Sequence, residues 1–246
     1  EDLITERTKA IMPVSLYGQC ADMEAINEIA KKHNLPVIED ACQSFGSTYN
    51  NKKSCNLSTI GCTSFFPSKP LGAYGDGGAI FTNDDALATK MRMLLNHGQN
   101  ERYKHKYIGI NGRLDAIQAA VLNIKLKHFD KEVKLRDEIG SRYSDLLENS
   151  DVITPKIAPN ATSVYAQYSI RVKNREAMIA KLSEKEIPTA VHYPVPLHMQ
   201  EAFKYLGYKE GDFPISEVVS KQIMSLPMSA YLSEAEQDFV IQAIKG

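Results

Sequence analysis

The sequence predicts an α/β fold built on a parallel β-sheet, followed by a smaller α+β unit. Two apolar runs, 10–14 and 35–40, flank a helical pattern whose apolar residues share one face. A strand, an amphipathic helix and a second strand at this spacing form a β-α-β unit with parallel strands. One long helix is expected over 114–147, which lacks proline and contains a single glycine, Gly140. A polar, proline-containing stretch at 149–159 then separates the two units.

The composition is typical of a globular protein with balanced charge. Of 246 residues, 43% are hydrophobic and 24% are charged, and 29 basic against 30 acidic side chains give a net charge of −1. This balance gives no reason to expect a nucleic-acid partner, and no apolar run suggests a membrane span. The four cysteines form no C-x-x-C pair, so we expect free thiols in a cytoplasmic protein and no metal site.

Two acidic residues stand at a strand end that is suited to ligand binding. The expected helix begins at Asp22 and ends near Asn34, and the strand 35–40 that follows closes with Glu39 and Asp40. Ligands of parallel sheets bind beyond the carboxyl ends of the strands. The alternative is an ordinary helix cap or loop carboxylate. A divalent metal is not expected, because no further ligand occurs at a matching spacing.

The segment 63–82 contains a lysine in a stiff, glycine-rich loop. It reads T-S-F-F-P-S-K-P-L-G-A-Y-G-D-G-G-A-I-F-T. Pro67 and Pro70 restrict the backbone on both sides of Lys69, and the glycines that follow permit tight turns and close approach to a ligand. An apolar strand, a stiffened loop and a glycine-rich return to a second apolar run suit a lysine that points into a site. A solvated lysine in a surface turn is the alternative reading of the same residues.

The remaining elements follow from apolar periodicity and from capping residues. Asn83 and the two aspartates after it start a helix that extends to about Leu95, and the polar segment 99–110 is expected to be an irregular loop. In the second unit we expect strands over 165–172 and 189–191 and helices over 175–185, 216–224 and 234–244.

Six motifs, in the same order along the chain, resemble the DegT/DnrJ/EryC1/StrS sugar aminotransferases. They are I-x-P-V-S-L-Y-G (11–18), V-I-E-D-A-C-Q-S-F-G (37–46), S-F-F-P-S-K-P-L (64–71), G-D-G-G-A (75–79), G-I-N-G-R-L-D-A-I-Q-A-A (109–120) and V-H-Y-P-V-P-L-H (191–198). The resemblance implies the PLP-transferase fold, which is aspartate aminotransferase-like, with a three-layer large domain and a smaller α+β C-terminal domain. It places residues 1–130 in the large cofactor-binding domain and 131–246 in the connecting helix and small domain.

The resemblance also implies an activity and a cofactor. Such enzymes use pyridoxal phosphate to move an amino group from glutamate to a keto sugar, 3-keto or 4-keto, that is linked to a nucleotide diphosphate. They are homodimers with shared active sites, and they serve amino-sugar and surface-polysaccharide biosynthesis. Related dehydratases carry histidine where this chain has Lys69, which argues against a dehydratase or other lyase. A catalytically incompetent homologue that acts as a binding protein is a further alternative.

The resemblance assigns cofactor roles residue by residue. Lys69 would hold the cofactor as a Schiff base, and Asp40 would face its pyridine nitrogen. Gln43 would lie beside the ring hydroxyl. Ser64 would bind the phosphate, together with Asn111 of the partner subunit. From the residues alone, Gln43 is also consistent with a helix start and Asn111 with a turn between two glycines.

Three further residues match substrate-contacting positions. Arg113, His192 and Tyr193 correspond to such positions in relatives that act on acetamido-glucuronate nucleotides, which favours a 3-keto uridine diphosphate sugar. An arginine suits a carboxylate and a diphosphate equally well. Other roles stay open, since Arg113 could pair with Asp115 or Asp137 on the long helix, and the His192-Tyr193 pair could be a packed loop.

The family pattern starts earlier than this sequence does. Relatives begin with a loop and a helix that supply a cradle for the cofactor phosphate and an aromatic side chain over its ring. The sequence begins just before I-T-E-R-T-K-A-I and contains no tryptophan. We therefore expect an N-terminally truncated chain that binds the cofactor weakly.

Overall fold

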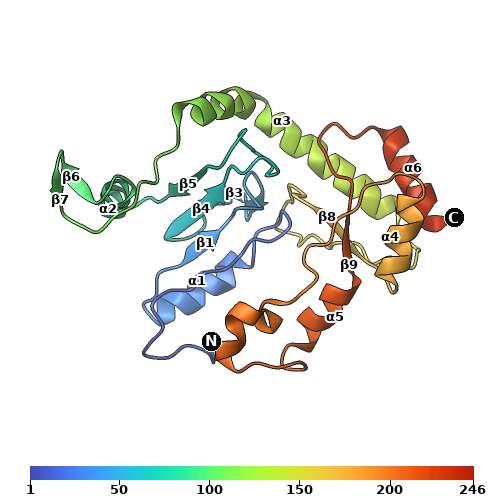
Figure 1. Ribbon diagram of the computed structural model, residues 1–246, viewed down its shortest axis with the longest axis horizontal. Coiled ribbons are helices and arrows are strands. Elements are labelled where there is room, and N and C mark those ends of the chain that lie inside the picture. The colour runs from blue at the N-terminus through green and yellow to red at the C-terminus, as the bar shows by residue number, and fades with distance from the viewer. The chain divides into compact units, whose positions relative to one another are not determined.

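The chain divides into two compact units. The computed structural model describes residues 1–246. The first unit comprises residues 1–134 and 157–166, and the second comprises 135–156 and 167–246. One continuous helix, α3 (Ala116–Leu146), contributes to both units, in agreement with the long helix expected from the sequence (Figure 1).

A three-stranded sheet in the order β1-β4-β5 forms the centre of the first unit. Its strands are β1 (Ile38–Asp40), β4 (Ile60–Ser64) and β5 (Gly78–Phe81). β1 and β4 are parallel, but β5 runs antiparallel to β4, with Ser64 opposite Gly78. The expectation of a parallel sheet is therefore correct for β1 and β4 and wrong for β5, because the glycine-rich return reverses the chain beside β4.

The apolar run 10–14 pairs with β1 but is not a regular strand. Ile11 and Val14 form parallel bridges with Val37 and Asp40, as the β-α-β pattern predicts. Pro13 lies between the two bridges and has no N–H to donate, which interrupts the ladder.

Two short helices of the first unit begin where the sequence predicts. In α1 (Met23–Lys32) the carboxylate of Asp22 accepts the N–H of Ala25, and in α2 (Asp85–Leu95) Asp84 is the N-cap. The buried side of α1 packs into a cluster with the segment around β1. That cluster contains Cys20, Met23, Ala30, Val37 and Tyr49.

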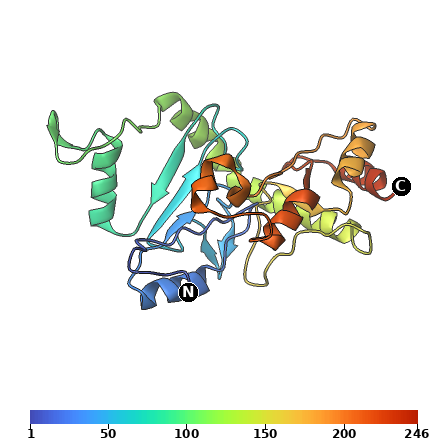
Figure 2. The ribbon, with the colours of Figure 1, turned by 60° about the horizontal axis from the view of Figure 1, so that its bottom comes forward.

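The loop that carries Lys69 belongs to a second apolar cluster, under the first half of α3. Its buried members are Phe65, Leu71, Ala73, Leu122 and Phe129. The sheet lies between α1 and this part of α3 (Figures 1 and 2). Burial of residues on both sides of Lys69 therefore fixes the course of the loop.

The expected irregular loop at 99–110 contains a hairpin instead. β6 (Gln99–Glu101) and β7 (Lys104–His105) are antiparallel, and Tyr103 in the turn has a φ of 66°. The polar composition of the segment gives no apolar alternation, so this hairpin was not predicted. A second small hairpin is formed by β2 (Thr48–Tyr49) and β3 (Lys52–Lys53).

The second unit contains a two-stranded antiparallel sheet, β8 (Tyr168–Arg171) and β9 (Ile223–Leu226). Its other elements are α4 (Arg175–Ser183), η1 (Leu197–Met199), η2 (Glu201–Leu206), α5 (Pro214–Gln222) and α6 (Glu234–Lys245). The helix predicted over 216–224 ends at Gln222, where β9 begins. The strand predicted over 189–191 is reduced to one bridge, between Ala190 and Ser225.

The core of the second unit is built around the second half of α3. The rings of Tyr143 and Tyr168 are fully buried with centroids 4.9 Å apart. Arg142 forms an ion pair of 2.7 Å with Asp238 on α6. None of the helices combines the length and the apolar character that crossing a lipid bilayer requires.

Candidate functional site

Asp40 and Ser64 are the last residues of two neighbouring parallel strands, β1 and β4. Their carboxyl ends meet at one edge of the sheet, where ligands of such folds bind. Oδ1 of the half-buried Asp40 accepts the N–H of Cys42 at 3.1 Å, which fixes the direction of the carboxylate. Oγ of Ser64 accepts the N–H of Phe66 at 3.2 Å, so the hydroxyl proton remains to be donated to a ligand.

Lys69 lies on the loop between β4 and β5. Its backbone N–H bonds to the carbonyl oxygen of Phe66 at 2.9 Å, and the residue is half-buried. A turn at this point directs the chain back toward the apolar cluster, while Lys69 itself stays partly open to solvent. The lysine is therefore presented at the sheet edge on which Asp40 and Ser64 lie.

The end of this loop is tied to α3 by two side chains. Lys125 donates from Nζ to the carbonyl oxygen of Gly72. Oε1 of Gln118 accepts the N–H of Tyr74 at 2.8 Å. These contacts restrain the segment just after Lys69.

Burial and two charged residues set the pKa of the Cys42 thiol. Burial raises the pKa of the Cys42 thiol to about 12. The Asp40 carboxylate adds to this rise in pKa, whereas the positive charge of Lys69 opposes it. The thiol is therefore protonated at neutral pH and does not compete with Lys69 as a nucleophile.

Gln43 is buried just beyond the end of β1. Its Oε1 accepts the N–H of Tyr17 at 2.8 Å, and Tyr17 adopts a positive φ of 60°. This bond fixes the orientation of the amide, since the oxygen faces Tyr17. The NH₂ group, which only donates hydrogen bonds, forms the other end of the amide.

Asn111 and Arg113 lie elsewhere in the first unit, beside Asn96 at the end of α2. Asn111 bridges to Asn96. Arg113 donates to Oδ1 of Asn96 at 3.0 Å, and its Nη1 is 3.1 Å from Nε2 of His97. No hydrogen bond or ion pair joins either residue to Lys69, and the alternative pairing of Arg113 with Asp115 or Asp137 is not formed.

His192 and Tyr193 belong to the second unit. Nδ1 of His192 is 2.9 Å from Oγ of Ser225. Burial lowers the pKa of His192, so the imidazole is neutral at neutral pH. Tyr193 is half exposed, and its ring meets the His192 ring edge-to-face at 5.6 Å.

Several contacts that hold the site were not predicted from the sequence. They are the bonds Tyr17–Gln43, Gln118–Tyr74 and Lys125–Gly72. The sequence spacing of Gln118 and Lys125 could have indicated two of these contacts. The two residues are two helical turns apart and therefore share one face of α3. Their loop partners could not be named, since that requires knowledge of how α3 packs.

Comparison with protein families matches residues 1–245 to the DegT/DnrJ/EryC1/StrS aminotransferase family. The chain belongs to this family. The match spans nearly all of the chain and confirms the resemblance on which the sequence prediction rests.

Two sugar aminotransferases of the family share much of the sequence. The chain is 53% identical over 244 residues to UDP-2-acetamido-2-deoxy-3-oxo-D-glucuronate aminotransferase of Pseudomonas aeruginosa, covering 99% of this chain and 67% of that protein. It is 44% identical to dTDP-3-amino-3,6-dideoxy-alpha-D-galactopyranose transaminase of Aneurinibacillus thermoaerophilus, covering 99% and 67%. The chain therefore spans about two thirds of the length of these family members.

Solved structures of the family confirm the predicted PLP-transferase fold. A DegT DnrJ EryC1 StrS aminotransferase from Brucella abortus matches with a TM-score of 0.93 and 45% identity, covering 97% of this chain and 64% of that one. DesV of S. venezuelae matches with a TM-score of 0.95 and 38% identity, covering 98% and 66%.

The donor chemistry at the sheet edge fits pyridoxal phosphate, on which the family depends. A primary amine on Lys69, a carboxylate on Asp40 and a hydroxyl donor on Ser64 are present together on the loop and strand ends described above. A carboxylate suits a protonated ring nitrogen, and a hydroxyl donor suits a phosphate. The residues present therefore fit the cofactor.

Proposed function

We propose that the protein is a pyridoxal phosphate-dependent aminotransferase that moves an amino group from glutamate to a keto sugar linked to a nucleotide diphosphate. The observation that carries this proposal is the placement of Lys69 and Asp40. Asp40 ends β1, and Lys69 lies on the loop that follows β4, the parallel neighbour of β1. Membership of the aminotransferase family supports the same conclusion.

Each residue of the site has a definite task in this reaction. Pyridoxal phosphate, when bound, supplies the electron sink for the carbon that loses a proton. Asp40, held by the Cys42 N–H, would keep a proton on the ring nitrogen, because a nearby negative charge raises the proton affinity of that atom. The amine of Lys69 would bind the cofactor and then carry a proton between two carbons. The hydroxyl of Ser64 would donate to the phosphate and the amide of Gln43 to the ring hydroxyl.

We propose a 3-keto uridine diphosphate sugar with a carboxylate and an acetamido group as the amino acceptor, on the way to a surface polysaccharide. The 53% identity to the Pseudomonas aeruginosa enzyme, which is named for such a substrate, supports this choice. Arg113 carries a guanidinium that suits a carboxylate or a diphosphate. His192, with its lowered pKa, offers a neutral imidazole as a hydrogen-bonding partner for the sugar.

We further propose a homodimer in which Asn111 of the partner subunit binds the cofactor phosphate. Large apolar side chains close to Asn111 in sequence support this arrangement, since Ile108 is 100% exposed, Ile110 67% and Ile117 74%. Exposed apolar groups gathered along one segment are typical of an interface. We also propose a cytoplasmic location, because four free cysteines suit a reducing compartment.

Absorbance spectroscopy tests the cofactor assignment. Wild-type protein with added pyridoxal phosphate should show a visible absorbance band that glutamate removes. Lys69→Ala should abolish the band, and Asp40→Asn should keep it while slowing the reaction with glutamate by about 100-fold, as expected when a preorganised charge is lost. Lys127→Ala, an exposed residue on α3, is the control. A band that survives Lys69→Ala would contradict the proposed role of that lysine.

A panel of 3-keto and 4-keto sugar nucleotides, on uridine and thymidine diphosphates, tests the acceptor. We expect amino transfer from glutamate to be fastest with the 3-keto uronate. Transfer only to 4-keto sugars would reject the proposed substrate but would still support aminotransferase activity. Binding of the cofactor with no transfer to any member of the panel would favour a binding protein instead.

A further inference from the structure

The segment 192–198 of the second unit has a histidine at each end, and its first end is anchored by buried hydroxyl groups. Nδ1 of His192 lies 2.9 Å from Oγ of Ser225, and that oxygen lies 3.0 Å from Oγ of Ser169. Ser169 and Ser225 face each other on the paired strands β8 and β9, and both are buried. The first end of the segment is therefore held by the sheet itself.

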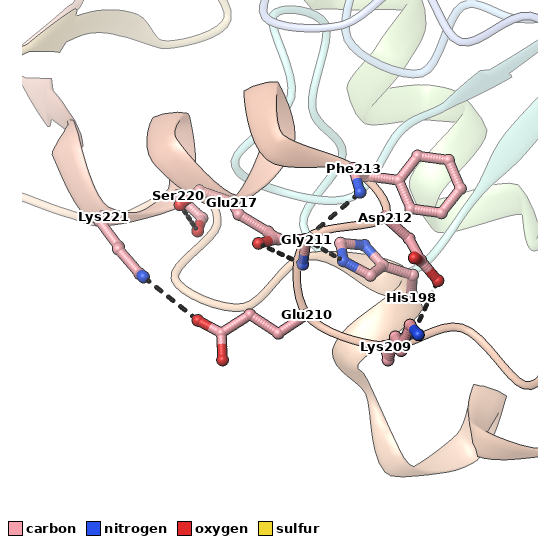
Figure 3. Close-up of polar contacts among 9 residues, drawn as sticks. All are labelled: His198, Lys209, Glu210, Gly211, Asp212, Phe213, Glu217, Ser220 and Lys221. Atoms are coloured by element: carbon pink, nitrogen blue, oxygen red, sulfur yellow. Dashed lines mark hydrogen bonds and ion pairs between the residues drawn. The ribbon is translucent and has the colours of Figure 1, made fainter.

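The other end is anchored by a hydrogen-bonded histidine–glutamate pair that the proposed chemistry does not use. Nε2 of His198 lies 2.9 Å from Oε1 of Glu217 on α5, and the side chains are only 7% and 12% exposed (Figure 3). Glu217 also accepts the N–H of Gly211 at 2.9 Å and that of Phe213 at 3.3 Å. The ring of His198 packs against the ring of Phe213 with centroids 4.7 Å apart.

The pKa of Glu217 follows from its surroundings. Burial tends to raise the pKa of Glu217, but the hydrogen bonds from His198, Gly211 and Phe213 lower it more, so the net shift is downward. An ionised carboxylate only accepts hydrogen bonds, so Nε2 of His198 is the donor. A charge-assisted bond in a nearly buried place holds its geometry better than an exposed pair does.

Between the two anchored histidines, the chain is stiff and open to solvent. Tyr193 is 51% exposed and Leu197 73% exposed. Pro194 and Pro196 fix φ at two of the five intervening positions. An exposed, partly apolar segment that is restrained at both ends has the properties of a preorganised binding loop, because little freedom is left to lose when a ligand binds.

We propose that the His198–Glu217 pair positions the segment 193–197 for recognition of the sugar nucleotide. This inference rests on the proposed aminotransferase function. His198 acts through the backbone that it anchors and does not itself touch the substrate. Breaking the pair should loosen the segment and weaken binding of the sugar nucleotide, while the reaction with glutamate, which needs Lys69 and Asp40, should proceed as before.

Kinetics of His198→Leu and His198→Gln test this role. Leucine removes the donor, so the KM for the sugar nucleotide should rise about tenfold, with kcat changed by less than about twofold. The rate of the glutamate half-reaction should stay the same. Glutamine retains an N–H donor and should restore part of the loss. His33→Leu is the matched control, because His33 forms an exposed pair with Glu1 at the same distance of 2.9 Å.

Hydrogen exchange supplies a second measurement that needs no turnover. In the full chain without substrate, the amides of Tyr193, Val195 and Leu197 should exchange about tenfold faster in His198→Leu, with α4 and α6 unchanged. Wild-type exchange rates and KM in that variant would overturn the inference. A fall in thermal stability and kcat with an unchanged KM would also overturn it, since that result means a purely structural role. Failure of the proposed function is distinguishable, because the wild-type protein itself would then show no transfer.

Discussion

The ammonium group of Lys125 donates a hydrogen bond to the carbonyl oxygen of Gly72, three residues beyond Lys69. Lys125 lies on α3, so the helix that covers the apolar cluster also holds the end of the lysine loop. Hydrogen bonds from charged donors contribute about 1.5–3 kcal/mol. The position of Lys69 therefore depends on a residue far away in the sequence.

Replacing Lys125 with methionine should weaken cofactor binding. The substitution keeps the apolar stem and removes the donor, and the freed loop then has to be ordered when the cofactor binds. We expect the dissociation constant for pyridoxal phosphate to rise about tenfold, measured by titration of the visible absorbance. Lys127→Met, on an exposed position of the same helix, should bind as the wild type does. Equal affinities for the two variants would show that the bond to Gly72 does not hold the loop.

Gly72→Ala should disturb the same loop from within. A Cβ at this position would lie 2.4 Å from the carbonyl oxygen of Pro67, a backbone atom that cannot move without shifting the turn around Lys69. We expect a loss of about 1–3 kcal/mol in the free energy of unfolding, measured with urea, together with weaker cofactor binding. At Gly75 the nearest atom is Nε2 of the flexible Gln118 side chain, at 3.0 Å. Gly75→Ala should therefore cost less, and the reverse order would contradict this steric account.

Local signals in the sequence predicted the helices better than the strands. Asp22 was recognised as a cap and 83–85 as a helix start, because a capping side chain bonds to N–H groups two or three residues away. β9 (Ile223–Leu226) was missed because its apolar residues continue the pattern of α5. Its pairing with β8 joins residues more than fifty positions apart, and periodicity carries no information about such a pairing.

The site shows the same division between local and tertiary information. Motifs identified Lys69 and Asp40, since each lies in a short stretch with a recognisable order of residues. The bonds Lys125–Gly72 and His198–Glu217 join residues whose proximity depends on packing. The sequence could name the candidate reacting groups but not the side chains that hold them.

Mixed dimers provide a test of the shared active site. Lys69→Ala and Asn111→Ala should each be inactive or nearly so when pure. If Asn111 serves the cofactor site of the partner subunit, a dimer of the two variants contains one site with both native residues. When equal amounts of the two variants exchange subunits at random, half of the dimers are mixed and each of these has one native site. About a quarter of the wild-type activity should then be restored. Mixtures no more active than the separate variants would show that Asn111 acts within its own subunit.

Glu39 is a buried carboxyl beside Asp40 on β1, with no ion-pair partner. It is 0% exposed; Oε2 accepts the N–H of Cys55 at 2.8 Å, and Oε1 accepts the hydroxyl of Ser15 at 3.2 Å. Burial raises the pKa of Glu39 and the charge of Asp40 adds to the rise, while the two hydrogen bonds oppose it only in part. The ionised form is therefore less favourable in the folded protein than in the unfolded chain.

Glu39→Gln should gain stability over the wild type as pH increases. A carboxyl whose pKa is raised by folding contributes its full stabilisation at pH values below its pKa in the unfolded chain, 4.5. This contribution is lost as the pH rises through the pKa of the folded state. Glutamine accepts from Cys55 with its oxygen, donates to Ser15 with its nitrogen and does not titrate. The free energy of unfolding of the variant minus that of the wild type should increase with pH from about 4 to 8, measured with urea. A difference that falls with rising pH would reject the raised pKa, and Glu28→Gln, exposed on α1, serves as the control.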